Sequence, residues 1–163
     1  LRMPRLDGIA ATRAVRALPR PPQVIALTTW DVDDAVLRSL EAGAEGFLLK
    51  SASPAEIITA VKAVVAGDAV LSPRSTRQVL DHYTRDGSEQ ARQEAEAAMD
   101  GLTEREQEVA IAVGQGLSNG EAAERLFVSA ATVKAHLAAI QSKLGVRNRV
   151  QVAVHVERAG LLR

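Results

Sequence analysis

A segment near the carboxyl end of the chain carries positive charge and no carboxylate. Between Arg125 and Val156 there is no aspartate or glutamate, whereas this segment has five lysines and arginines and two histidines. The whole chain has 20 residues of each sign, so its basic character is local. The preceding residues 84–100 have five acidic residues and two arginines. A basic segment without acids suits a polyanion such as nucleic acid, because a carboxylate would repel its phosphates.

The residues between Ser129 and Gly145 predict a helix whose opposite sides differ in chemistry. At about 100° per residue, one side gathers an apolar stripe that we expect in a core: Val133, Leu137, Ile140 and Leu144. The opposite side presents a ridge of small residues between two polar shoulders. The ridge has Ala131, Ala135, Ala138 and Ser142, one shoulder has Lys134 and Gln141, and the other has Thr132, His136 and Lys143. Such a ridge can approach the floor of the DNA major groove while the shoulders reach its phosphates.

A short turn at residues 127–129 joins this helix to an earlier one that includes residues 121–126. This arrangement is typical of a helix-turn-helix, in which the first helix crosses the DNA backbone and the second enters the groove. Arg147 and Arg149 follow, and we expect them to hold phosphates at the far end of the second helix. From the pattern alone, a small helical bundle that does not bind DNA is the alternative.

The last 62 residues repeat the signals that start and end helices. Thr103 with Glu106 and Ser118 with Glu121 each predict a capping box, in which a hydroxyl and a carboxylate satisfy free backbone amides reciprocally. Two more residues favour N-caps, and three glycines mark helix ends: Ser129 and Asn148, then Gly116, Gly145 and Gly160. We therefore expect a separate all-α domain of four short helices at residues 102–163.

The first 72 residues alternate between helix and strand signals. We expect helices at 8–18, 31–44 and 53–67 and strands at 23–29 and 46–50, which predicts an α/β domain with a parallel sheet. Two strands are too few to bury these helices on both faces, so we expect the amino-terminal half of the domain to be missing. Residues 73–101 predict one further helix, at 73–83, and then a polar linker that is partly helical.

Composition narrows the class of protein. Hydrophobic residues make up 47% and charged residues 25%, and no apolar run reaches the roughly 18 residues that would span a bilayer. The chain has no cysteine, and nothing resembles a signal peptide, so we expect a cytoplasmic protein without a membrane partner. No glycine-rich phosphate loop, metal-ligand cluster or nucleophile–base spacing indicates an enzyme.

Residues 102–162 resemble the LuxR-type helix-turn-helix domain throughout. The motifs are LTEREQEV, GLSNGEAAERLFVSAATVKAHL and KLGVRNR. The resemblance implies base-edge readout by Lys134 and Ala135 and dimerisation through the last helix, where we expect Val152 and Val156 at the interface. It also implies phosphate contacts by Thr132, His136, Lys143, Ser118 and Asn119. Some relatives have a longer polar or basic residue in place of Ala138, so fewer direct base contacts are expected here.

The first part of the chain resembles the end of a receiver domain of NarL/FixJ-type response regulators. The similar segments are LRMPRLDGIAATR, VIALTTW, EAGAEGFLLKSASPAEI and VVAGDAVLSP. The resemblance implies a truncated flavodoxin-like fold in which Thr28 hydrogen-bonds a phosphoryl group, Lys50 pairs with it and Phe47 is the switch aromatic. The main-chain carbonyl of Arg2 would complete a Mg²⁺ shell in the intact domain. The phosphate-accepting aspartate would directly precede Leu1, so this fragment is expected to bind no metal.

These features together predict a two-component response regulator that acts as a sequence-specific, DNA-binding transcription regulator. Its expected partners are double-stranded DNA, a sensor histidine kinase, a second copy on DNA and, as a further candidate, RNA polymerase. Without the aspartate, we expect the chain to be either constitutively competent for DNA or partly unfolded in its first half. The alternatives are a sigma-factor-like promoter-reading protein, which the α/β half argues against, and a small α/β enzyme or phosphotransfer and protein-interaction module that does not bind DNA.

Overall fold

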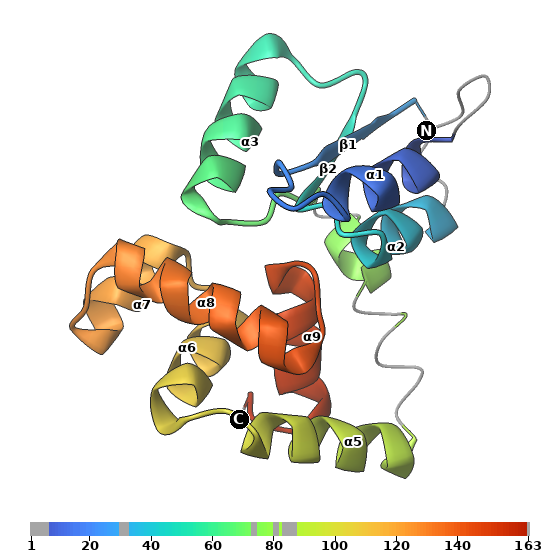
Figure 1. The fold of residues 1–163 in the computed structure, drawn as a ribbon. Coiled ribbons are helices and arrows are strands. Elements are labelled where there is room, and N and C mark those ends of the chain that lie inside the picture. Colours follow the sequence, from blue (N-terminus) through green and yellow to red (C-terminus); the bar gives the residue numbers. More distant parts are fainter. Residues whose placement is uncertain (1–6, 30–32, 73–74, 80–81, 83–87, 163) are drawn as a thin grey trace. The chain divides into compact units, whose positions relative to one another are not determined.

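The computed structural model describes residues 7–29, 33–72, 75–79, 82 and 88–162 (Figure 1). The chain divides into two compact units, Leu1–His82 and Tyr83–Arg163. In the described residues, no helix has both the length and the apolar character needed to cross a membrane.

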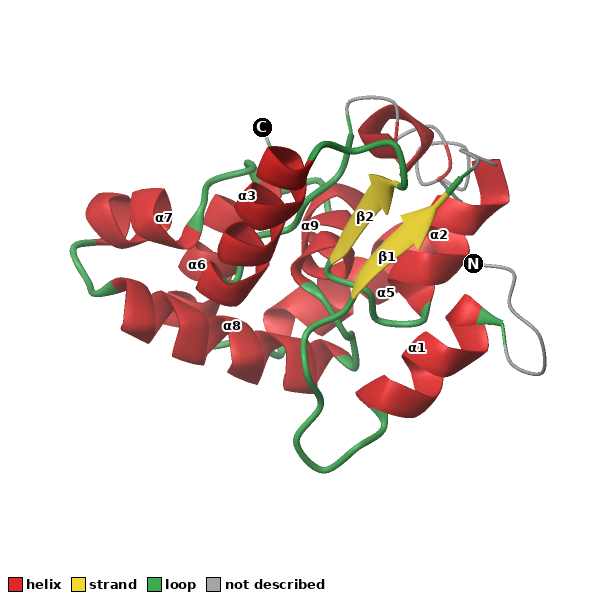
Figure 2. Ribbon diagram, turned by 90° about the horizontal axis from the view of Figure 1, so that it is seen from above, coloured by secondary structure: helices red, strands yellow, loops and turns green. Residues whose placement is uncertain are grey.

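The first unit is a parallel α/β structure, as the sequence predicts. Its elements are α1 (Gly8–Arg16), β1 (Ile25–Thr28), α2 (Asp33–Glu41), β2 (Gly46–Leu49) and α3 (Pro54–Ala66). The two strands run in the same direction, with Ile25 opposite Gly46 and Thr28 opposite Leu49. Figure 2 shows α3 on one side of this sheet and α1 and α2 on the other. Because the strands are parallel, their carboxyl ends lie at one edge of the sheet.

The core of the first unit is small. Phe47 of β2 packs in it together with Val36 and Leu40 of α2, and all three side chains are buried. By contrast, α3 leaves three large apolar side chains exposed, Ile58, Val61 and Val65. The described part of the sheet has two strands, so little of the apolar surface of α3 finds cover.

The second unit is all-α, and the four helices predicted in its last part are confirmed. They are α6 (Glu104–Gly114), α7 (Asn119–Leu126), α8 (Ala130–Leu144) and α9 (Arg149–Arg158). Both predicted capping boxes are present, at Thr103 with Glu106 and at Ser118 with Glu121. Ser129 and Asn148 cap α8 and α9. The core lies between α6, α7, α8 and α9, where Val109, Val133 and Ile140 are fully buried.

Residues 89–100, predicted to lie in a polar and partly helical linker, are helical throughout and pack on the second unit. These residues form helix α5 (Glu89–Asp100), which begins after the N-cap Ser88 and packs against α9. Its contact is a narrow stripe: Ala95 and Met99 are each 2% exposed and belong to the core of the second unit. Of the helix predicted at 73–83, residues 75–79 and 82 are helical, and the other residues lie outside the described part, as do residues 84–87.

Candidate nucleic-acid interface

Helix α8 separates an apolar face from a smooth exposed face. Val133, Leu137 and Ile140 are buried against the rest of the second unit, as predicted. On the opposite side, Ala131, Ala135, Ala138 and Ser142 are exposed, and so is Lys134. We call the four small residues the α8 ridge, and Lys134 lies on the shoulder beside it. The ridge makes no part of the core.

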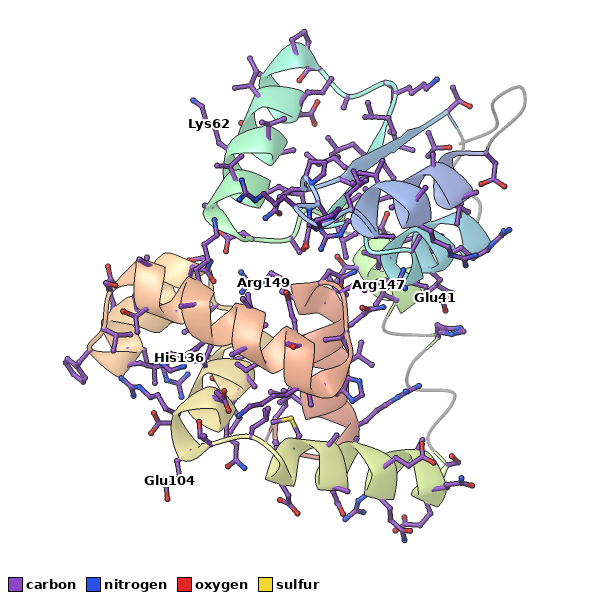
Figure 3. All side chains as sticks on the ribbon, in the orientation of Figure 1. Glu41, Lys62, Glu104, His136, Arg147 and Arg149 are labelled. Carbon is purple, nitrogen blue, oxygen red and sulfur yellow. The ribbon has the colours of Figure 1, made fainter. Side chains whose placement is uncertain are left out.

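The shoulder residues at the start of α8 are ordered by local hydrogen bonds. The amide of Thr132 donates to Ser129 Oγ at 3.0 Å, and the Oγ atoms of the two residues lie 2.8 Å apart. The Thr132 hydroxyl is half-buried beside the first turn of the helix, and His136, labelled in Figure 3, is also half-buried. Both side chains flank the ridge, so the structure brings together the residues that the sequence placed on this surface.

Lys143, a predicted phosphate contact, already has a carboxylate partner. Its Nζ donates to Glu106 Oε2 at 2.6 Å, and the same oxygen accepts the amide of Thr103 at 2.8 Å. The hydrogen bond from Lys143, followed by that from the Thr103 amide, lowers the pKa of Glu106 to about 2. Lys143 therefore ties the end of α8 to the start of α6, and its charge is partly neutralised before any DNA binds.

Arg149 does not occupy the position predicted for it. Its side chain is 6% exposed, whereas that of Arg147 is exposed; both are labelled near the start of α9 in Figure 3. The Nη2 atom of Arg149 donates to the main-chain carbonyl of Leu117, and its Nη1 atom donates to Asn119 Oδ1 at 3.4 Å. The prediction that Arg149 holds a phosphate is therefore wrong, because its guanidinium points into the protein.

The two residues predicted to contact phosphate at the start of α7 also differ. Asn119 is 3% exposed and turns inward to Arg149, so the structure contradicts the prediction for its side chain. Ser118 is half-buried, and both its amide and its hydroxyl bind Glu121 Oε2, at 2.8 and 2.7 Å. These hydrogen bonds, first of all that from the amide, lower the pKa of Glu121. A phosphate contact by Ser118 stays a prediction.

Val152 and Val156 belong to the core rather than to a subunit interface. Both side chains are 0% exposed, and Val156 lies against Gly114 of α6. The prediction that they form a dimer interface is wrong because their surface is already covered by their own chain. The half-buried apolar residues of α9 are Val150, Ala153 and Val154.

Of the residues predicted to sense a phosphoryl group, Thr28 and Lys50 lie at the carboxyl ends of the two strands, and Phe47 lies within β2. Thr28 ends β1, and the amide of Lys50 donates to its carbonyl at 2.6 Å. Thr28 is buried and Lys50 is exposed, while Phe47 is buried opposite Ala26 in the sheet register. Arg2 lies outside the described residues. The described residues contain no group of three or more His, Cys, Asp or Glu side chains that could hold a metal ion.

Two further residues around the helix-turn-helix were not predicted. Arg105 of α6 donates from Nη2 to the carbonyl of Leu126, the last residue of α7, at 2.6 Å. Phe127, in the turn, has the left-handed conformation with φ 55° and is 95% exposed. The sequence gives no signal for the first contact, since its partners are 21 positions apart. The left-handed conformation of Phe127 was not predicted because glycine is the residue that usually indicates it, and this position is a phenylalanine.

Known proteins match both units. Residues 1–62 match the response regulator receiver domain, and residues 100–156 match the luxR family of bacterial regulatory proteins. The transcriptional regulatory protein LnrK of Bacillus subtilis (strain 168) is 38% identical over 99% of this chain and 74% of LnrK. The chain is a response regulator of the luxR family. It is also similar to LiaR of B. subtilis, with 36% identity over 98% of this chain and 73% of LiaR.

More distant relatives of the response regulator include the nitrate/nitrite response regulator NarP of Escherichia coli (strain K12). It is 35% identical over 94% of this chain and 68% of NarP. Among solved structures, the response regulator ChrA of a heme-sensing two-component system is 37% identical, with a TM-score of 0.42 over 99% of this chain and 74% of ChrA. The two family matches show that the response regulator combines receiver-domain sequence with a luxR-type DNA-binding domain, and its relatives are transcriptional regulatory proteins.

Proposed function

We propose that this response regulator places α8 in the major groove of duplex DNA, with the α8 ridge against the base edges. The observation that carries the proposal is the division of α8 into a buried stripe and an exposed ridge of alanines beside Lys134. Methyl-sized groups let the helix axis come close to the bases, and a lysine on such a face can reach guanine O6 and N7.

Phosphate contacts flank this ridge in the proposed complex. Thr132 and His136 lie on one shoulder of α8, and Arg147 follows its carboxyl end. Ser118 at the start of α7 is a fourth candidate, because the first helix of a helix-turn-helix crosses the DNA backbone. In this proposal the phosphate contacts fix the register of the protein on the duplex, and the α8 ridge contacts the base edges that carry the sequence.

We further propose that two copies bind DNA together and that the receiver domain controls them. Val150, Ala153 and Val154 replace Val152 and Val156 as the apolar residues of α9 that a second copy can cover. The adjacent strand ends of Thr28 and Lys50 support a response to a phosphoryl group, with a sensor histidine kinase as its source and Phe47 as the switch aromatic. In receiver domains as a class, Mg²⁺ supplies charge neutralisation for that phosphoryl group.

Substitution of Lys134 tests the DNA proposal. We expect Lys134→Ala to weaken binding to a duplex selected from a random-sequence library by the wild-type chain. The slope of log K against log salt should change by about 0.9 if the ammonium replaces one counterion. Lys62→Ala is the matched control, because Lys62 is an exposed lysine on α3 of the first unit. Unchanged affinity and unchanged slope in Lys134→Ala would show that α8 does not read the groove through Lys134.

A further inference from the structure

Helix α7, which precedes the proposed recognition helix, has little packing of its own. It has eight residues: Asn119, Ala122 and Ala123 are buried, and Leu126 is its one large apolar side chain packed against the core, where it is partly buried. A helix of two turns is not stable alone. Alanine side chains gain little from burial, because they remove little apolar area from water. The position of α7 therefore depends on contacts with the helices around it.

Two arginines from neighbouring helices bind main-chain carbonyls at opposite ends of α7. Before its amino end, Arg149 of α9 donates to the Leu117 carbonyl and to Asn119 Oδ1. At its carboxyl end, Arg105 of α6 donates to the Leu126 carbonyl at 2.6 Å. Contacts to the main chain fix the path of the backbone itself. Together they fasten both ends of α7, one to α9 and the other to α6.

The guanidinium group suits this task better than another cation would. It is planar and presents several N–H donors in fixed directions, so it sets an orientation as well as a distance. Arg149 uses two nitrogens on two acceptors, and Arg105 divides its nitrogens between Leu126 and Glu108. Arg149 is also too deeply buried to meet a phosphate. A lysine at either position would keep the positive charge but would not present several N–H donors in fixed directions.

The position of α7 decides where α8 begins. Phe127 and Val128 alone separate the last residue of α7 from Ser129, the N-cap of α8. The amide of Phe127 donates back to carbonyls of α7, and the amide of Val128 donates to the Ala123 carbonyl at 3.0 Å, so the turn is hydrogen-bonded to the last turn of α7. A tilt of α7 would therefore act on the first turn of α8, whose later turns are held in the core by Val133, Leu137 and Ile140.

We infer that Arg105 and Arg149 are positioning residues for DNA binding. They fasten the two ends of α7 and so present the α8 ridge to the groove at one angle, without touching DNA themselves. This inference rests on the proposed function, since it assigns to α8 the contact with DNA. It predicts that the geometry of each guanidinium matters for specific binding and that its charge alone does not suffice.

Charge-conserving substitutions in the full chain test the inference. We expect Arg149→Lys and Arg105→Lys each to weaken binding to the selected duplex by about tenfold, the worth of a charge-assisted hydrogen bond. The salt slope should stay unchanged, because no phosphate contact is lost. Affinity for sheared mixed-sequence duplex should also stay unchanged. Arg92→Lys is the matched control, because Arg92 pairs with Glu96 on the exposed face of α5.

Amide hydrogen exchange supplies a measurement that does not involve DNA. In both lysine variants, protection should fall in α7 and in residues 127–132, while the buried parts of α6 and α9 keep theirs. Full specific affinity in both variants, a changed salt slope, or unchanged protection of α7 would overturn the inference. Loss of cooperative unfolding in both variants would also overturn it, because the arginines would then stabilise the whole unit. A wild-type chain that bound no duplex would contradict the proposed function, and the exchange comparison would still decide whether the arginines fix α7.

Discussion

At the scale of single residues, the Glu106 carboxylate joins two helices of the DNA-binding unit. It accepts the Thr103 amide at the start of α6 and the Lys143 ammonium near the end of α8. These contacts lower its pKa from 4.5 to about 2, so the folded protein binds the Glu106 proton less tightly than the unfolded chain does. The stabilisation is fully present above pH 4.5 and is lost as the pH falls toward about 2.

The variant Glu106→Gln tests this linkage. We expect the free energy of unfolding near neutral pH to fall by about 2 kcal/mol, because a charged hydrogen-bond acceptor is replaced by a neutral one. Urea unfolding at a series of pH values measures the effect. The difference from the wild-type chain should shrink between pH 4.5 and about 2. Glu104→Gln, at an exposed site in the first turn of the same helix, is the control. A difference of constant size across this range would contradict the assignment.

Phe127 has a backbone conformation that is costly for an L-residue, and its side chain gains nothing in return. An L-residue loses about 1 kcal/mol or more in the left-handed region, and a ring that is 95% exposed gains nothing from burial. We expect Phe127→Gly to raise the free energy of unfolding by about 1 kcal/mol. Thermal unfolding measures the change. Phe127→Ala removes the ring and keeps the Cβ atom, so it should have little effect; equal stabilisation by both variants would assign the cost to the ring.

At the scale of elements, the crossing of α6 and α9 depends on a glycine. A Cβ atom on Gly114 would lie 2.9 Å from Val156 Cγ1 and 2.9 Å from Leu162 Cδ2. Because Val156 is fully buried and cannot withdraw, we expect Gly114→Ala to destabilise the unit by about 2 kcal/mol. Gly120→Ala in α7 is the opposite case: a Cβ atom there meets Ser118 Oγ at 3.9 Å, and alanine should stabilise the helix. Urea unfolding of both variants would be inconsistent with this packing if Gly114→Ala were neutral.

The helices could be predicted from the sequence because their signals are local. Each N-cap and its partner lie three residues apart, as in Ser118 with Glu121. The pairings that position the site are not local. Glu106 and Lys143 are 37 positions apart, and Arg149 and Leu117 are 32 apart. No periodicity in the sequence reports such contacts, which is why Arg149 was predicted to face DNA.

Two other errors have a common cause, the ambiguity of a helix face. Helix α9 carries valines on several sides, and its sequence does not say which of them meet their own core; Val152 and Val156 do. In helix α5 the error is the opposite one, because buried residues were overlooked. Ala95 and Met99 lie four residues apart on one side of the helix and are buried, although most of its other residues are polar. That spacing after the N-cap Ser88 was the available signal.

At the scale of the whole molecule, the second unit carries its own core. Its buried residues come from all five helices of residues 83–163, including α5. We expect residues 83–163 alone to unfold cooperatively at the same temperature as the corresponding transition of the full chain. Residues 102–163, the domain predicted from the sequence, lack Met99 and should be less stable by about 3 kcal/mol. Calorimetry of the two fragments decides between the boundaries; equal stability would show that α5 is dispensable.

The α8 ridge also has a consequence for the evolution of this regulator together with its DNA sites. Because Ala131, Ala135 and Ala138 add nothing to the core, their replacement by longer side chains carries no folding penalty, and a new base preference can arise in one mutational step. In the proposed complex, alanines discriminate few bases, so we expect much of the selectivity to come from how easily a duplex narrows or bends to meet the protein. A promoter would then be recognised as much by the deformability of its DNA as by direct contacts to its bases.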